Sequence, residues 1–252
     1  MAFIGPHRPD SHGDSLAAVR RGLLAGLAGL LLAVEPPGWT TGWGVAARPD
    51  APASTAQVAD FGSTTPSPAA RALANNVARV RDHQGLPFFV IDKATATLHV
   101  FDGDSRLQAS SPVLLGSAPG DDSVPGIGSR PIGLIQPEER TTPAGRFVAE
   151  AGRNLQGEDI VWVDHHAAIS MHRVRTAKPL ERRAERLATP TTDDNRISYG
   201  CINVPVDFYD AHVRTVFAAS RTAIVYITPQ TRPLKEQFAW MEVPTDRVAH
   251  TP

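Results

Sequence analysis

One short stretch organises this chain of 252 residues: Arg196-Ile197-Ser198-Tyr199-Gly200-Cys201-Ile202-Asn203-Val204-Pro205. It contains Cys201, the only cysteine in the sequence. Upstream, the apolar run Ala168-Ile169-Ser170-Met171-His172 predicts a strand that ends in a histidine. A thiol and an imidazole are the minimum for nucleophilic acyl transfer, because sulfur attacks as the thiolate and a nearby base must take its proton. Gly200 precedes the cysteine and would let a substrate carbonyl approach the backbone closely. The two stretches together predict a cysteine–histidine site.

The N-terminal segment predicts export, with residues 1–47 as a signal peptide. A polar start is followed by Arg20-Arg21 and by an apolar run over residues 22–34, which has the length of a signal-peptide core. Small residues at positions 44–47 fit a cleavage site, and the paired arginines fit twin-arginine export. The alternative is an uncleaved N-terminal membrane anchor. We therefore expect a periplasmic or cell-wall-associated protein.

Export changes the interpretation of the single cysteine. Exported proteins usually pair their cysteines, so a single one indicates an intermolecular disulfide or a reactive thiol. The alternative is an inert, buried cysteine that packs as a small hydrophobic residue. The neighbouring Gly200 and the strand-end His172 favour the reactive thiol. The net charge of −1 and the scattered basic residues give no reason to expect a nucleic-acid partner.

The period of the apolar residues divides the rest of the chain. Residues 48–66 are rich in Ala, Pro, Ser and Thr, which predicts a flexible linker. Residues 67–85 predict an amphipathic helix, with Ser67 as N-cap, Pro68 at the first helical position and Gly85 as the stop. From residue 86 the period changes to 2, and short strands are predicted at residues 88–92, 97–101, 107–115, 147–151, 160–163, 167–171 and 223–227.

These elements predict a mostly β domain with flanking helices over residues 86–230, followed by a C-terminal tail over residues 231–252. Residues 116–130 are rich in glycine and proline and predict a long loop, of the kind that lines a site. Residues 178–188 are highly charged and predict a solvated surface helix between His172 and Cys201.

Four segments in this order resemble the L,D-transpeptidase (YkuD-type) catalytic domain family. They are an opening hairpin over residues 90–101, Thr142-Pro143-Ala144-Gly145-Arg146-Phe147, Met171-His172, and Ser198-Tyr199-Gly200-Cys201-Ile202-Asn203. The likeness covers about residues 87–229 and implies a β-sandwich catalytic domain. The sequence departs from the family pattern at three places: Tyr199 replaces a histidine, Arg173 replaces a glycine, and the segment at 178–188 resembles an insertion.

The resemblance also implies a reaction. Cys201 would be the nucleophile and His172 the base, while backbone N–H groups of Gly200 and Cys201, with Tyr199, would hold the oxyanion. Ser198, Asn203 and Arg173 would complete the pocket. The implied acyl donor is a peptidoglycan tetrapeptide stem, attacked at the L-centre of its third residue with release of the terminal D-alanine. An amine acceptor, on another stem or on a protein, gives a crosslink or an attached protein, and water gives an L,D-carboxypeptidase.

Two further interpretations compete with acyl transfer. Asp164, His165, His166 and His172 cluster in the sequence and would suit zinc, although no acidic general base is placed as in the HExxH motif. The other alternative is a peptidoglycan-binding domain that kept the fold and lost catalysis, with Tyr199 marking the loss. The acyl-transfer interpretation needs no metal or cofactor.

Overall fold

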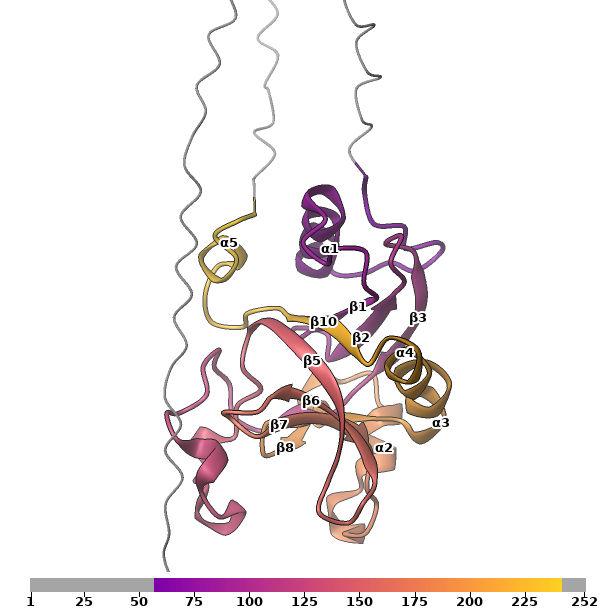
Figure 1. Cartoon of the computed structure of the whole chain (residues 1–252). Helices are drawn as coiled ribbons and strands as arrows, with labels where there is room; N and C mark the ends of the chain where they lie inside the picture. The colour runs from indigo at the N-terminus through magenta and orange to yellow at the C-terminus, as the bar shows by residue number, and fades with distance from the viewer. Residues whose placement is uncertain (1–56, 242–252) are drawn as a thin grey trace, which may run out of the picture. The chain divides into compact units, whose positions relative to one another are not determined.

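The computed structural model describes residues 57–241 of the chain (Figure 1). The predicted signal peptide at residues 1–47, its membrane-anchor alternative and the ends of the predicted linker and tail lie outside the described residues. The chain divides into units at residues 1–49 and 50–252, and every described residue belongs to the second unit. Within residues 57–241, no helix combines the length and the apolar character that crossing a membrane requires.

In the described part of the chain, one eight-stranded sheet with the order β3-β2-β1-β10-β5-β6-β7-β9 forms the centre of the domain. Its strands are β1 (Phe88–Asp92), β2 (Thr97–Phe101), β3 (Leu107–Pro112), β5 (Gly145–Arg153), β6 (Asp159–Asp164), β7 (Ile169–Arg173), β9 (Ile202–Val204) and β10 (Thr222–Ile227). Two short strands, β4 (Leu115–Gly116) and β8 (Arg196–Ser198), pair in parallel beside it. The prediction of a mostly β domain with flanking helices is confirmed.

The sheet curls until it nearly closes on itself. Leu114, two residues beyond β3, exchanges backbone hydrogen bonds of 2.9 Å in both directions with Asn203 of β9, the strand at the far end of the order. Side chains from strands at both ends of the sheet share one apolar core, which includes Leu98 of β2 and Val204 of β9. The architecture is therefore one curled sheet whose two ends meet around a common core.

Strand β1 shows why its sequence is an unbroken apolar run. Phe89 and Ile91 point into the inner core, whereas Phe88 and Val90 point to the outer face and pack under a helix. Successive side chains of a strand alternate between faces, so a strand that is covered on both faces needs apolar residues at every position. All five residues of β1 are buried.

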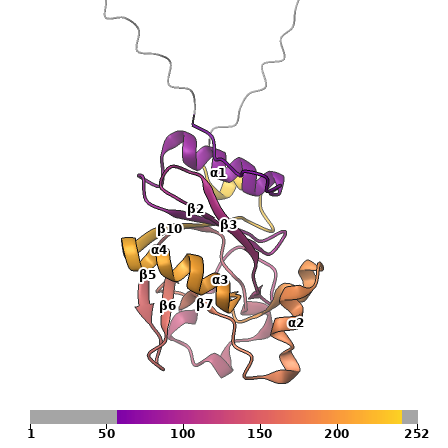
Figure 2. The same cartoon turned by 90° about the vertical axis from the view of Figure 1, so that its right-hand side faces the viewer.

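The helix on the outer face is α1 (Pro68–Val80), and its N-terminus is as predicted. The Ser67 Oγ accepts a 3.1 Å hydrogen bond from the Ala70 N–H. The helix ends before Gly85, because Arg81 adopts a left-handed conformation and its N–H turns back to the carbonyl groups of the last turn. The inner face is covered by α3 (Val206–Phe208), the π-helical η6 (Tyr209–Val213) and α4 (Arg214–Ser220), so helices lie on both sides of the sheet (Figure 2).

Both segments that flank the predicted domain are partly packed. Asp60, in the predicted linker, exchanges backbone hydrogen bonds with residues around the β2–β3 turn, and Phe61 is buried against the outer cluster. In the predicted tail, Phe238 follows α5 (Leu234–Gln237), is buried and packs near Tyr226. A low density of apolar residues hid both contacts, because only a few side chains of each segment pack against the outer cluster.

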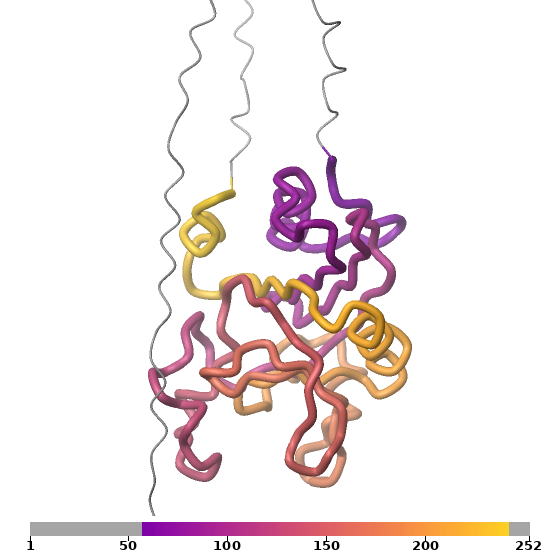
Figure 3. Tube along the Cα trace, viewed as in Figure 1, coloured from indigo at the N-terminus to yellow at the C-terminus, as the bar shows by residue number. Residues whose placement is uncertain are grey.

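Two long excursions of the chain lie at the end of the domain away from α1 (Figure 3). Residues 117–144 carry η1 (Ile127–Ser129), η2 (Ile132–Leu134) and η3 (Pro137–Glu139). Residues 174–195 carry η4 (Pro179–Glu181), α2 (Arg183–Ala188) and η5 (Thr192–Asn195). These excursions border the candidate site.

Candidate active site

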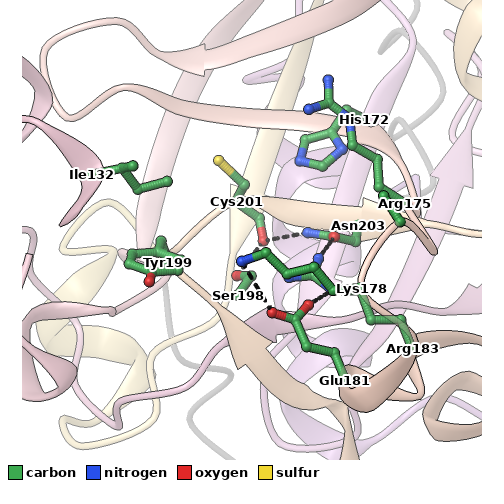
Figure 4. A pocket seen from close by; sticks show the side chains of 11 residues that line it. Ile132, His172, Arg175, Lys178, Glu181, Arg183, Ser198, Tyr199, Cys201 and Asn203 are labelled. Carbon is green, nitrogen blue, oxygen red and sulfur yellow. Dashed lines mark hydrogen bonds and ion pairs between the residues drawn. The ribbon is translucent and has the colours of Figure 1, made fainter.

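The parallel pairing of β7 with β9 brings the predicted cysteine and histidine together. Met171 pairs with Ile202 and His172 pairs with Asn203. Since side chains alternate along each strand, Met171 and Ile202 enter the inner core, and His172 and Asn203 project from the opposite face. Cys201 directly precedes β9 and lies on this same outer side, next to His172 (Figure 4).

The thiol of Cys201 is half-buried and contacts polar groups of β7. The Ser170 hydroxyl lies 3.6 Å from the Cys201 Sγ, which in turn lies 3.8 Å from the carbonyl oxygen of Ala168. The His172 Nδ1 lies 2.7 Å from the carbonyl oxygen of Arg173. A carbonyl can only accept, so this bond places the ring proton on Nδ1 and leaves Nε2 as a proton acceptor.

The surroundings of Cys201 favour its thiolate. Burial raises the pKa of the thiol, but the hydrogen bond and charge of His172 and the hydrogen bonds from Ser170 lower it by more. The pKa of Cys201 therefore lies below the usual range of a thiol, which increases the fraction of the nucleophilic form at neutral pH.

Gly200 forms a tight elbow that presents Cys201. Its φ is +122°, and a Cβ at this position would lie 2.7 Å from the Thr141 carbonyl oxygen and 2.8 Å from Ile169 Cδ1. The Gly200 carbonyl accepts a 2.8 Å hydrogen bond from the buried Thr142 Oγ1, which itself accepts one from the Gly116 N–H. Thr142 therefore supports the backbone directly before Cys201.

Of the backbone N–H groups expected to hold the oxyanion, that of Gly200 is already hydrogen-bonded within the protein. The Ser198 Oγ accepts a 3.0 Å hydrogen bond from the Gly200 N–H and donates a 2.6 Å bond to the Cys201 carbonyl, which also accepts from Asn203 Nδ2 at 3.2 Å. The assignment of the Gly200 N–H to the oxyanion is therefore wrong, because a hydroxyl already occupies it. Among residues 57–241, the N–H groups of Cys201 and Tyr199 have no hydrogen-bond partner, so these two remain as donors.

Tyr199 lines the site through its ring. The guanidinium carbon of Arg140 lies 4.1 Å from the centre of that ring, within cation–π distance. Arg140 follows η3 and is tied to its own loop, because one of its guanidinium nitrogens donates to the Ile135 carbonyl at 3.2 Å. At the position where the L,D-transpeptidase pattern has a histidine, this chain therefore has a tyrosine ring that packs against the guanidinium of Arg140.

The thiol opens into a pocket of about 320 Å³ (Figure 4). Its lining comes from the sheet, from the Ser198-Tyr199 turn, from Ile132 of η2 and from residues 175–183 of the second excursion. The complete lining is Ile132, His172, Arg175, Ala177, Lys178, Glu181, Arg183, Ser198, Tyr199, Cys201 and Asn203.

Arg173 does not line this pocket, which corrects its assignment as a pocket residue. Its guanidinium bonds the Asp159 carboxylate at 3.0 Å and the Asp210 carboxylate at 3.1 Å, and stacks 4.4 Å from the ring centre of Tyr209. Arg173 follows His172 on the same strand and therefore points to the opposite face. Its role is to tie β7 to β6 and η6.

Two groups of site residues escaped the sequence-based assignment. Ser170 was detectable, because the alternation that places His172 on one face of β7 places Ser170 on the same face. Arg183 and its neighbours were expected on a solvated helix, but the Arg183 side chain is only 13% exposed and bonds both Glu181 and the Asn203 Oδ1. The only feature of the sequence that marks this segment is its high density of charged residues. Exposed surface helices have the same feature, so it does not identify Arg183 as a pocket residue.

Asp164, His165 and His166 of the zinc alternative lie apart from this site and from His172. In the β6–β7 turn, the Asp164 carboxylate accepts the N–H groups of His166 and Ala167, and His165 stacks on Trp162 at 5.2 Å. His172 lies at the other end of β7. In the part of the chain that the structure describes, no three His, Cys, Asp or Glu side chains are arranged to hold a metal ion.

Comparisons with known proteins give matches among solved structures. No protein-family model matches the chain, and neither does a curated protein. Similar structures include the LD transpeptidase LdtMt1 in complex with imipenem (15% identity, TM-score 0.34, covering 56% of this chain and 58% of that one). An L,D-transpeptidase from Mycobacterium smegmatis matches with 14% identity, a TM-score of 0.31 and coverage of 56% and 58%. The helical cell shape determining protein Pgp2 from Campylobacter jejuni matches with 12% identity, a TM-score of 0.38 and coverage of 58% and 49%. The chain thus spans about half to three-fifths of the length of these structures.

Proposed function

We propose that this protein is an exported cysteine acyltransferase of the L,D-transpeptidase type that acts on peptidoglycan tetrapeptide stems in the periplasm or cell wall. The observation that carries the proposal is the arrangement of Cys201 after the tight Gly200 elbow, beside His172 and Ser170 and open to a pocket. A thiol of lowered pKa and an adjacent imidazole in one cleft are typical of a nucleophilic site.

In the acylation step, His172 Nε2 takes the proton of the Cys201 thiol. The thiolate attacks the carbonyl carbon at the L-centre of the third stem residue and forms a tetrahedral intermediate. The intermediate collapses as the bond to the terminal D-alanine breaks, and the His172 imidazolium returns its proton to the leaving amine. The product is a thioester on Cys201 and free D-alanine.

In the second step, an acceptor amine loses its proton to His172 and attacks the thioester. The new amide forms as the carbon–sulfur bond breaks, and Cys201 is regenerated with the proton from His172. Attack by water instead would release the shortened stem as a carboxylic acid. The same groups serve both reactions, so the acceptor determines whether the outcome is crosslinking, protein attachment or hydrolysis.

The negative charge that develops on the substrate carbonyl oxygen must be stabilised by hydrogen-bond donors. The N–H of Cys201 is free of other partners within residues 57–241, and the Tyr199 N–H is its neighbour. Loss of one such donor typically costs on the order of 3 kcal/mol of transition-state stabilisation. The bonds from Ser198 and Asn203 to the Cys201 carbonyl fix the orientation of this part of the backbone.

The substrate assignment is supported by sequence and geometry together. The Thr142-Pro143 motif, which the resemblance singles out, braces Gly200 in the structure, and the segment from Ser198 to Asn203 surrounds the nucleophile. Export, which the N-terminal sequence predicts, would bring the domain to peptidoglycan.

A carbapenem provides the first test, because its strained lactam carbonyl acylates an activated thiol. We expect intact-protein mass spectrometry to show one adduct on the wild-type domain, none on Cys201→Ser, and slower formation, by about 10²-fold or more, on His172→Ala. If the wild type forms no adduct although iodoacetamide still alkylates Cys201, the catalytic proposal fails and the peptidoglycan-binding alternative gains support.

A synthetic tetrapeptide stem then tests the substrate. We expect release of D-alanine with Cys201 present and none from Cys201→Ala. Supplying an amine acceptor distinguishes the outcomes, since a transpeptidase forms the amide product and a carboxypeptidase forms only the shortened peptide. A wild-type domain that forms the carbapenem adduct but releases no D-alanine would contradict the assignment of the substrate.

A further inference from the structure

The segment over residues 175–183, which overlaps the insertion predicted at residues 178–188, is joined by side-chain contacts to the backbone of Cys201. Glu181 bonds the Arg183 Nε at 2.5 Å, and Arg183 Nη1 donates to the Asn203 Oδ1. Asn203 Nδ2 in turn bonds the carbonyl of Cys201. This chain of contacts holds the segment as a wall of the pocket, and Arg175 and Lys178 of that wall line the pocket together with His172 and Cys201 (Figure 4).

That wall carries an excess of positive charge. Arg175, Lys178 and Arg183 line the pocket, and Glu181 is the one carboxylate among the lining residues. Glu181 is already bonded to Arg183 at 2.5 Å and approaches Lys178 only at 3.4 Å. Arg175 pairs with Glu158, which lies outside this pocket. After these pairings, the ammonium of Lys178 is only weakly neutralised, and its side chain is 72% exposed.

From this imbalance we propose that residues 175–183 select acyl donors whose third residue, next to the scissile bond, carries a free side-chain carboxylate. The inference rests on the proposed function and narrows its substrate class to stem peptides with carboxylate rather than carboxamide side groups. Lys178 contacts the carboxylate as a mobile point charge, and Arg175 reinforces it from the same wall. A carboxamide oxygen can still accept a hydrogen bond from either cation, but it carries no negative charge and gains no ion-pair attraction, so the two substrates differ in transition-state stabilisation.

The test uses two tetrapeptides that differ only at the side-chain carboxylate of the third residue. This group is free in one peptide and converted to a carboxamide in the other. The readout is the ratio of their kcat/KM values for D-alanine release. We expect the wild type to prefer the carboxylate peptide by about tenfold, Lys178→Met to reduce the ratio toward one, and Lys178→Glu to reverse it. The matched control is Lys235→Met, an exposed lysine of α5 outside the pocket, which should retain the wild-type ratio.

The ratio keeps this inference separate from the proposed function. If neither peptide releases D-alanine, the proposed function fails first. If both peptides react and the wild-type ratio is near one, the function stands and the inference is overturned. The inference is also overturned if the preference survives in the double variant Arg175→Met/Lys178→Met, because both cations assigned to the carboxylate are then gone.

Discussion

At the scale of single residues, Gly200 determines how the thiol of Cys201 is positioned. We predict that Gly200→Ala destabilises the domain by about 1–3 kcal/mol, because it combines a disfavoured backbone conformation with close contact to a carbonyl oxygen of the chain. The variant should also form the carbapenem adduct more slowly, since any relief of the clash moves Cys201. Thermal unfolding and adduct kinetics measure the two effects.

The control for this prediction is Gly133→Ala in η2. A Cβ at Gly133 meets no atom within 4 Å, and the backbone there is not left-handed. Its unfolding temperature should therefore remain close to that of the wild type. Equal stability of the two variants would contradict the prediction, because it would show that the backbone at Gly200 relaxes to accept a Cβ without cost.

Residue identities could be predicted from sequence where one local pattern determines them. Cys201 and His172 stand out because one is the only cysteine and the other ends an apolar strand. Arg173 was misassigned because the comparison with the family pattern ignored the strand alternation that turns it away from the site. The loss of the Gly200 N–H as a donor depends on the rotamer of Ser198, which no pattern in the sequence specifies.

At the scale of elements, sequence patterns predict a strand or helix well when its burial pattern is regular. β1 and β2 lie where period and apolar runs placed them, and α1 begins at the predicted cap. The end of α1 was predicted too late, since left-handed Arg81 stops the helix before any glycine. The segment after β7 was predicted as a solvated helix, because its contacts come from Asn203, which lies on another strand.

Helix α1 contributes stability without touching the site. Leu73 is fully buried between α1 and the outer face of the sheet, so Leu73→Ala should cost about 2–5 kcal/mol in the free energy of unfolding. Below its lowered unfolding temperature, the variant should form the carbapenem adduct at the wild-type rate, because α1 packs over β1 and β10, whereas the site lies on β7 and β9. Val80→Ala is the control, since that side chain is 43% exposed and its truncation should change stability little. A large loss of reactivity in folded Leu73→Ala would contradict this separation.

At the scale of the whole molecule, the closure of the sheet depends on contacts between distant parts of the chain. The bonds between Leu114 and Asn203 join residues that lie far apart in the sequence, and no local pattern predicts such a pairing. The same holds for the buried pair of Lys93 and Asp121, whose ammonium and carboxylate lie 2.9 Å apart. Local patterns therefore predict the strands and the pairing of Cys201 with His172, whereas the curled sheet and the walls of the pocket depend on contacts that no local pattern specifies.

Asp121 joins three remote segments, and its removal tests that role. Its carboxylate binds Lys93 at the β1–β2 turn and accepts N–H groups from Gln230, Thr231 and Arg232 beyond β10. Asp121→Asn would leave the buried Lys93 ammonium without its counter-ion, so we expect a loss of about 3–5 kcal/mol at pH 7. Asp104→Asn is the control, because the Asp104–Arg106 pair is largely exposed and should contribute less than about 1 kcal/mol.

The pH dependence of the free energy of unfolding tests whether the charge of Asp121 carries this stabilisation. Burial raises the pKa of Asp121, but the hydrogen bonds from Thr231, Gln230 and Lys93 outweigh burial and hold that pKa well below its usual range. A group whose pKa is depressed by folding stabilises the protein above its unfolded pKa, about 3.9, and loses this contribution as the pH falls toward the folded value. Denaturant unfolding of wild type and Asp121→Asn should therefore differ most near neutral pH and converge in acid. A difference that stayed constant down to pH 2 would assign the loss to packing, because the charge of Asp121 would then make no contribution.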